Sequence, residues 1–294
     1  MDRALAAAEF KLSITRALAD QLEAALRQLV PAPLTAEQIN ALQRRPGVYQ
    51  LYVDRKLVYV GKASGRLPTR LTRHAKALSG RTGFEGAEIG FVCLYVDEDL
   101  DAVAPEKMLI GRYQARGESP WNNNGFGSND PGKERDTTVI ESNHFDALYP
   151  ANLDQIVELT PGSTTVRSML AELKRKLPYN LRYQDPRKSK PAALAYETEL
   201  VVPQEPITAS DALTLVVSAL PEEWQATVLP GYAILYRDVR DYESARFYIR
   251  REAEGVVRVE GPGKQGPPKD DIGVTTSSDD SEDAEDLSGT GDGD

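Results

Sequence analysis

The sequence has little cysteine and no long apolar run. Cys93 is the single cysteine among 294 residues, which excludes an intrachain disulfide framework and a cysteine-rich zinc site. No run approaches the roughly 18 apolar residues of a membrane helix. The opening residues, Met1-Asp2-Arg3-Ala4, lack the apolar core of a signal peptide. We therefore expect a cytoplasmic protein that does not enter a membrane.

Basic residues are absent from the tail Asp270–Asp294, which holds ten acidic residues. The remaining residues, 1–269, contain 35 basic and 35 acidic residues, so the formal net charge of −10 comes from the tail. Within the neutral body, Arg55–Arg81 holds eight Lys or Arg and no acidic residue. A basic block of this kind suits binding to a phosphate backbone, and a solvated surface is the alternative.

The order of expected elements predicts an α+β fold, an α/β sandwich. Its centre is a small, mostly antiparallel three-stranded sheet flanked by helices. Both strands of the hairpin carry apolar residues on each side, so we expect both strands to be central and covered on each face. Helical spacing, proline and capping signals, and β-rich runs define the elements. We expect helices at 3–29, 35–45, 68–78 and 104–115, strands at 48–53, 57–62 and 87–96, and a loop at 117–137.

These elements predict four regions. An N-terminal helical arm covers 1–45, the central domain covers 46–152, and an accessory α/β region of unknown role covers 153–260. In that region we expect a helix at 164–177, strands at 200–202 and 233–236, and helix over 209–228 interrupted at Pro221. Residues 261–294 are rich in Gly, Pro, Ser, Asp and Glu, which predicts a disordered acidic tail.

Two tyrosines on the hairpin are the first candidate site residues. A three-residue loop at 54–56 places Leu51 opposite Tyr59 and Tyr49 opposite Gly61. Both tyrosines then project from one face as diagonal neighbours, within reach of a shared ligand. A two-residue loop would place them on opposite faces. The alternative is a pair of core tyrosines, since tyrosine favours strands.

Three further residue sets complete a candidate site. Arg70 and His74 share one face of the helix that follows the hairpin, with a basic surface helix as the alternative. Glu106 begins the last helix of the central domain. A carboxylate there suits Mg²⁺ beside substrate phosphates, and the alternative is a carboxylate favoured only by the helix dipole. Pro120-Trp121-Asn122 closes the set.

At these residues the sequence resembles the GIY-YIG endonuclease superfamily. Gly47-Val48-Tyr49 and Tyr59-Val60-Gly61 match the two halves of its name motif. Arg70 with His74 matches its Arg-x-x-x-His, Glu106 matches its metal-binding glutamate, and Asn122 its late asparagine. The resemblance implies the fold of that superfamily and a catalytic set of Tyr49, Tyr59, Arg70, His74, Glu106 and Asn122.

The implied reaction is Mg²⁺-dependent hydrolysis of a phosphodiester bond, with Mn²⁺ as a substitute. Tyr49 would deprotonate or orient the water, and Tyr59 would position the water or the phosphate. Because free tyrosine has a pKa near 10, Tyr49 would need a nearby positive charge such as Lys62 or His74. Arg70 would clamp phosphate oxygens, Glu106 would hold the metal beside the leaving 3′ oxygen, and Asn122 would support the site. Lys62, Arg66, Arg73 and Lys76 are the expected DNA-binding residues.

A narrower resemblance points to the type II restriction enzymes of the superfamily. It is carried by Tyr59-Val60-Gly61-Lys62-Ala63, Pro120-Trp121-Asn122, Gly125-Phe126-Gly127, Pro131-Gly132, and Phe145-Asp146 with Pro150, within about residues 40–152. That branch cuts a GC-only six-base palindrome and is paired with a cognate DNA methyltransferase. This chain departs from the branch in a shorter hairpin and a longer Glu106–Asn122 interval, which leaves Asn123 and Asn124 as alternatives to Asn122.

Cutting both strands of a palindrome needs two copies of the site, which predicts a homodimer on DNA. The arm at 3–29 either contacts the second copy or docks onto the sheet of its own chain. Two other functions stay open: a GIY-YIG repair or homing nuclease, although no zinc-finger or helix-turn-helix signature is present, and a non-catalytic nucleic-acid adaptor. An adaptor would be expected to lose one of Tyr49, Arg70 or Glu106, and all three are present.

Overall fold

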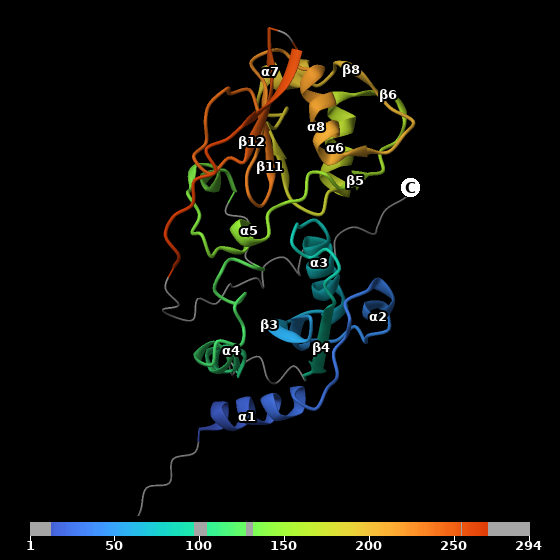
Figure 1. The fold of residues 1–294 in the computed structure, drawn as a ribbon. Coiled ribbons are helices and arrows are strands. Elements are labelled where there is room, and N and C mark those ends of the chain that lie inside the picture. Colours follow the sequence, from blue (N-terminus) through green and yellow to red (C-terminus); the bar gives the residue numbers. More distant parts are fainter. Residues whose placement is uncertain (1–12, 97–104, 128–131, 254, 270–294) are drawn as a thin grey trace, which may run out of the picture. The chain divides into compact units, whose positions relative to one another are not determined.

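The computed structural model describes residues 13–96, 105–127, 132–253 and 255–269. The chain is a mixed α and β protein that forms two compact units (Figure 1). The first unit contains the described residues up to Thr72 together with Ala87–Asn123. The second contains Arg73–Gly86 and the residues from Asn124 to the last described residue. None of the helices in these described ranges has the length and apolarity to cross a lipid bilayer.

The first unit is built on a four-stranded antiparallel sheet in the order β1-β4-β2-β3. Its elements, in chain order, are α1 (Ile14–Leu26), β1 (Ala32–Pro33), α2 (Ala36–Asn40), β2 (Gly47–Val53), β3 (Lys56–Ala63), the start of α3 (Leu67–Ser79), β4 (Ile89–Tyr95) and α4 (Pro105–Ala115). The three expected strands are therefore present, and the two-residue β1 adds a fourth at the edge of β4. β2 is central as expected, whereas the expectation of a central position is wrong for β3, which is an edge strand.

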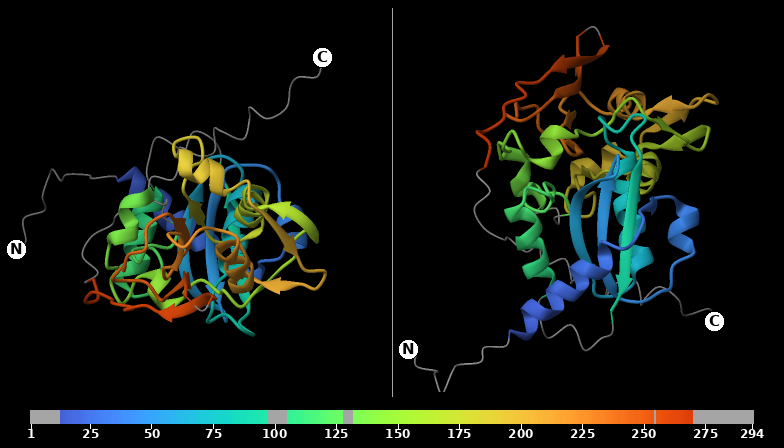
Figure 2. Two further views of the ribbon diagram at one scale, coloured as in Figure 1. Left: turned by 90° about the horizontal axis from the view of Figure 1, so that it is seen from above. Right: turned by 60° about the horizontal axis from the view of Figure 1, so that its bottom comes forward.

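Helices α1 and α4 cover one face of this sheet. Val48 and Val60 pack there with Leu26, Leu109 and Tyr113, and the right-hand view of Figure 2 shows the long strands side by side. The apolar face of α1 is therefore docked onto its own chain, which decides between the two alternatives for residues 14–26 of the arm. Residues 3–12 of the expected helix lie outside the described residues.

The second unit has a five-stranded sheet in the order β13-β12-β10-β11-β7, in which β11 and β7 are parallel. It contains the end of α3, a 3₁₀ helix at Gly132–Thr137, α5 (Phe145–Leu148), β5 (Ile156–Val157), β6 (Gly162–Thr165), α6 (Val166–Lys176), β7 (Leu181–Tyr183), α7 (Lys190–Ala195), β8 (Glu199–Val202), β9 (Ile207–Thr208), α8 (Ala209–Ser218), β10 (Gln225–Val228), β11 (Ala233–Tyr236), β12 (Phe247–Glu252) and β13 (Gly255–Glu260). Two short antiparallel pairs, β5-β9 and β6-β8, form separate sheets.

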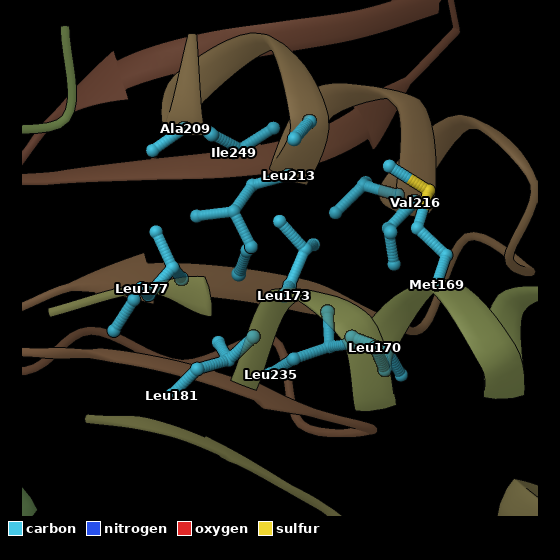
Figure 3. Close-up of a cluster of buried hydrophobic side chains, with 14 of the residues drawn as sticks. Met169, Leu170, Leu173, Leu177, Leu181, Ala209, Leu213, Val216, Leu235 and Ile249 are labelled. Atoms are coloured by element: carbon cyan, nitrogen blue, oxygen red, sulfur yellow. The ribbon is translucent and has the colours of Figure 1, made fainter. Parts of the chain in front are cut away.

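Alternating side chains give this sheet two apolar faces. Leu235 and Ile249 join α6 and α8 in the larger core (Figure 3). Their neighbours Ile234 and Tyr248 lie in a second cluster with Tyr232. Because successive residues of a strand point to opposite faces, strands buried on both sides read as continuous apolar runs.

Two expectations for this region are wrong. Residues 225–228 form the strand β10 and not helix, because α8 ends at Ser218 and the chain resumes after Pro221 in an extended conformation. The start of the expected tail is also ordered by pairing. The backbone N–H groups of Gly263 and Gly266 donate to the carbonyls of Ala245 and Ile140 at 2.8 Å. The acidic segment after 269 lies outside the described residues.

Candidate active site

The β2-β3 hairpin brings Tyr49 and Tyr59 to one face by an unexpected route. The loop has two residues, Asp54 and Arg55, both in the left-handed region with φ of 49° and 64°, as a tight hairpin turn requires. A register shift then leaves Val58 as an extra residue in β3. This β-bulge restores the pairing of Tyr49 with Gly61, so the expected register is confirmed although the expected three-residue loop is wrong.

The two tyrosine rings lie close together above Gly61. Their centroids are 6.1 Å apart with an angle of 39° between the ring planes. A Cβ on Gly61 would lie 2.5 Å from the Tyr49 hydroxyl and 2.8 Å from the ring of Tyr59. The glycine of the second half-motif is therefore required by packing, because a side chain there would displace both rings.

Arg70 reaches this face from α3. Its Nε donates a hydrogen bond to the Tyr49 hydroxyl at 3.3 Å, in a buried setting. Arg70 is 7% exposed, whereas Tyr49 is 0% exposed. Arg70 thus supplies the positive charge that is expected beside Tyr49, since the guanidinium stays protonated in proteins.

Lys62 does not supply this charge. In the β2-β3 register Lys62 is opposite Val48 and Tyr49 is opposite Gly61, so Lys62 and Tyr49 belong to opposite faces of the sheet. The expectation that Lys62 assists Tyr49 is therefore wrong.

The other three expected DNA-binding residues differ in exposure. Arg66 is exposed and Arg73 is half-buried. Lys76 is exposed, and its ammonium donates to the carbonyl of Arg175 at 3.1 Å.

Tyr52 is the tyrosine of the same strand that faces the other way. Its hydroxyl donates to Gln50 Oε1 at 2.7 Å. Burial, reinforced by Tyr113, raises the pKa of Tyr52 to about 12. A phenol held protonated by burial and used as a donor has a structural role, which sets Tyr52 apart from Tyr49.

Asn122 secures the free edge of β3. Its Oδ1 accepts from the Val60 N–H at 2.9 Å, and its Nδ2 donates to the Val60 carbonyl at 2.7 Å. The preceding Trp121 N–H donates to the carbonyl of the bulge residue Val58 at 2.9 Å. The side-chain amide of Asn122 therefore pairs with Val60 as the backbone of a neighbouring strand would. This fixes Val60, the residue between Tyr59 and Gly61. Among the three candidate asparagines, Asn122 is the one that binds the motif strand.

Glu106 is the second residue of α4, in the first turn of the helix as expected. Its backbone belongs to the same unit as Tyr49, Tyr59, Arg70 and Asn122. Its side chain lies outside what the structure describes, and among the described residues no three His, Cys, Asp or Glu side chains form a metal cluster. Mg²⁺ binds through one or two carboxylates with water and substrate phosphates, so a lone Glu106 fits this chemistry.

His74 belongs to the second unit, four residues after Arg70 on α3. Its ring stacks on Phe126 with 5.0 Å between centroids and 23° between planes. Gly125 and Gly127 flank Phe126 with φ of 93° and 71°. The Gly-Phe-Gly motif therefore forms a turn that presents Phe126 to His74, a contact that sequence reasoning did not foresee.

Phe145-Asp146 contacts the loop that carries this motif, since the Phe145 N–H donates to the Asn124 carbonyl at 2.6 Å. Asp146 is 5% exposed and pairs with Arg81 at 2.8 Å and with Arg135. Burial alone would raise the pKa of Asp146, but the two guanidinium groups outweigh it and hold the pKa below its ordinary value. A Cβ on Gly231 would meet this carboxylate at 2.2 Å, so Gly231 makes room for it.

The first unit brings together side chains whose chemistry suits phosphate binding and proton transfer. It has the Tyr49 phenol hydrogen-bonded to the Arg70 guanidinium, the Tyr59 phenol beside it, and the Asn122 amide, which fixes the strand of Tyr59. Comparisons with protein-family models, with curated proteins and with solved structures give no match for this chain.

Proposed function

We propose that this chain is a Mg²⁺-dependent DNA endonuclease with the GIY-YIG fold and of the type II restriction kind. It hydrolyses phosphodiester bonds of double-stranded DNA at a palindromic, GC-rich site. It acts as a homodimer on that site, and it is functionally paired with a cognate DNA methyltransferase. The observation that carries the proposal is the contact of Arg70 with Tyr49 on the face that Tyr59 shares. The element order β2-β3-α3-β4-α4 supports it.

In this reaction Tyr49 acts as a phenolate, stabilised by the Arg70 guanidinium, that orients the attacking water and takes its proton, so that the phenol is formed as the water attacks the phosphate. The fork of Arg70 also suits oxygens of the scissile phosphate. Tyr59 positions the water or the phosphate, and Asn122 keeps the strand of Tyr59 in register. When bound by Glu106, Mg²⁺ would neutralise phosphate charge and stabilise the leaving 3′ oxygen.

A second candidate is a nucleic-acid-binding adaptor that keeps the fold without catalysis. The observation that favours it is the complete burial of Tyr49, which is 0% exposed. A core tyrosine would make the same contact with Arg70. Only a test of cleavage separates these two functions.

The test is digestion of a mixed-sequence supercoiled plasmid, followed by sequencing of the ends. The wild type should cut at a single short palindrome with Mg²⁺ or Mn²⁺ and not with EDTA. Glu106→Gln should abolish cutting and retain DNA binding, because it removes the metal ligand and leaves the basic residues intact. Glu37→Gln is the matched control, since Glu37 is also a first-turn glutamate, on α2.

Three results would change the conclusion. Near-normal cutting by Glu106→Gln would remove Glu106 from the site. DNA binding without any cutting by the wild type would support the adaptor. A protein that sediments as a monomer with its DNA and accumulates nicked circles would contradict the dimer and favour a repair-type nuclease.

A further inference from the structure

The C-terminal ends of α3 and α6 meet inside the second unit. A Cβ on Gly80 would lie 2.2 Å from Pro178, so the residues after the two helices are in close contact. The Asn152 N–H donates to the Gly80 carbonyl at 2.8 Å. The ammonium of Lys76 binds the carbonyl of Arg175 in the last turn of α6 at 3.1 Å. Two segments that are nearly a hundred residues apart in sequence therefore share one surface.

Each of these helix ends is basic. The segment Arg73–Arg81 contains no acidic residue, and the last turn of α6 contains Lys174, Arg175 and Lys176. Two nearby carboxylates have cationic partners, since Glu172 pairs with Lys176 at 2.9 Å and Asp146 pairs with Arg81. Lys174 and Arg175 are exposed.

The helix dipoles explain only some of the basic residues at these two helix ends. A cation at a helix C-terminus is favourable, and the ammonium of Lys76 already takes a carbonyl of α6. The ammonium of Lys174 lies 5.6 Å from the ring centre of Tyr183. Arg175 projects from the same exposed turn. Two cations thus exceed what the helix ends require.

We propose that Lys174 and Arg175 extend the DNA-binding surface of α3, so that Arg73, Lys76, Lys174 and Arg175 form one α3–α6 basic surface. Its occupant is the phosphate backbone of duplex DNA, which matches several fixed cations on neighbouring helices. This rests on the proposed function, and it gives residues 153–260 a role as part of the nucleic-acid interface. Contacts to phosphate would position the duplex without reading its sequence.

The test measures equilibrium binding of a fluorescent duplex of about 20 base pairs, with EDTA to prevent cutting, from about 50 to about 200 mM NaCl. Lys174→Gln/Arg175→Gln should raise Kd about tenfold or more at the lowest salt, and lower the slope of log K against log salt by about 2. Arg237→Gln/Lys264→Gln is the matched control, because it removes the same charge from exposed surface pairs of the same unit.

The outcomes separate this inference from the proposed function. Equal affinity and equal salt slope in Lys174→Gln/Arg175→Gln and the wild type would overturn the α3–α6 basic surface, while cleavage by the wild type would leave the endonuclease standing. A wild type that binds no duplex overturns both. An equal loss in the control pair would also overturn the inference, since net charge alone would then explain the effect. Thermal melts check that the exposed substitutions leave the fold intact.

Discussion

The Nε of Arg70 donates a hydrogen bond to the hydroxyl of Tyr49, across 21 residues of sequence and between a helix and the central strand of a sheet. This contact joins the first half of the hairpin motif to the helix that follows it. Substitutions at this contact distinguish a structural role of Tyr49 from a catalytic one.

Tyr49→Phe should reduce cleavage by about 10²- to 10⁴-fold while DNA binding persists, because one oxygen is lost from the group that handles the proton. Arg70→Lys should also fail, since an ammonium does not replace the planar fork. Single-turnover cleavage of a plasmid measures both. Tyr52→Phe is the matched control on the opposite face of the same strand, and it should lower stability by about 1 kcal/mol without affecting the rate. Normal cutting by Tyr49→Phe would leave Tyr49 as a core residue.

Gly61→Ala should distort the tyrosine pair. The new Cβ would meet the Tyr49 hydroxyl at 2.5 Å, so the rings or the strand must move. We expect a loss of about 1–3 kcal/mol in the free energy of unfolding, which is typical of overpacked cores, together with loss of cleavage. Chemical denaturation measures the first effect. Gly266→Ala is the control, because its Cβ would have no neighbour closer than 3.8 Å, and equal stability of both variants would contradict the crowding.

Asn122→Ala should loosen the edge of β3. It removes two hydrogen bonds to Val60 and leaves that backbone without its partner, which corresponds to about 1–3 kcal/mol. Amide hydrogen exchange should show faster exchange at Val60 than in the wild type. Asn40→Ala, an exposed asparagine at the end of α2, is the comparison. Unchanged protection at Val60 in Asn122→Ala would show that the clamp does not hold the strand.

The second unit should lose stability below neutral pH through His144. Its Nδ1 accepts from the Asp146 N–H at 3.1 Å, so protonation removes the cap of α5. Burial lowers the pKa of His144, and Arg135 and Arg81 act in the same direction against the opposing Asp146 and Glu141. Because the pKa of His144 is lower in the folded state, the unfolded chain binds more protons than the folded chain below about pH 6.5. The free energy of unfolding therefore decreases as the pH is lowered through this range.

His144→Asn tests this effect, because asparagine also caps helices but does not titrate. Between about pH 7 and about pH 5 the Tm of the variant should fall less than that of the wild type. Measuring the difference between the two proteins cancels every other titrating group. Parallel Tm curves would exclude His144 as the source of the pH dependence.

The sequence by itself determined the elements that local chemistry specifies. Pro68 predicted the start of α3, Gly117 predicted the end of α4, and β-rich runs predicted β2, β3 and β4. The ordered motif residues identified the candidate site in the same way. These signals survive in a single chain because proline, glycine and side-chain alternation act within a few residues of each other.

The tertiary structure decided how those elements meet. The bulge at Val58, and not the loop length, sets the tyrosine register, and Arg70 rather than Lys62 lies beside Tyr49. The strand β10 and the pairing of Gly263 and Gly266 depend on partners far along the chain. Such contacts form between the backbone groups that are still unpaired and the apolar faces that are still uncovered after the local elements have formed. This pairing is a property of the assembled chain, and no short segment encodes it.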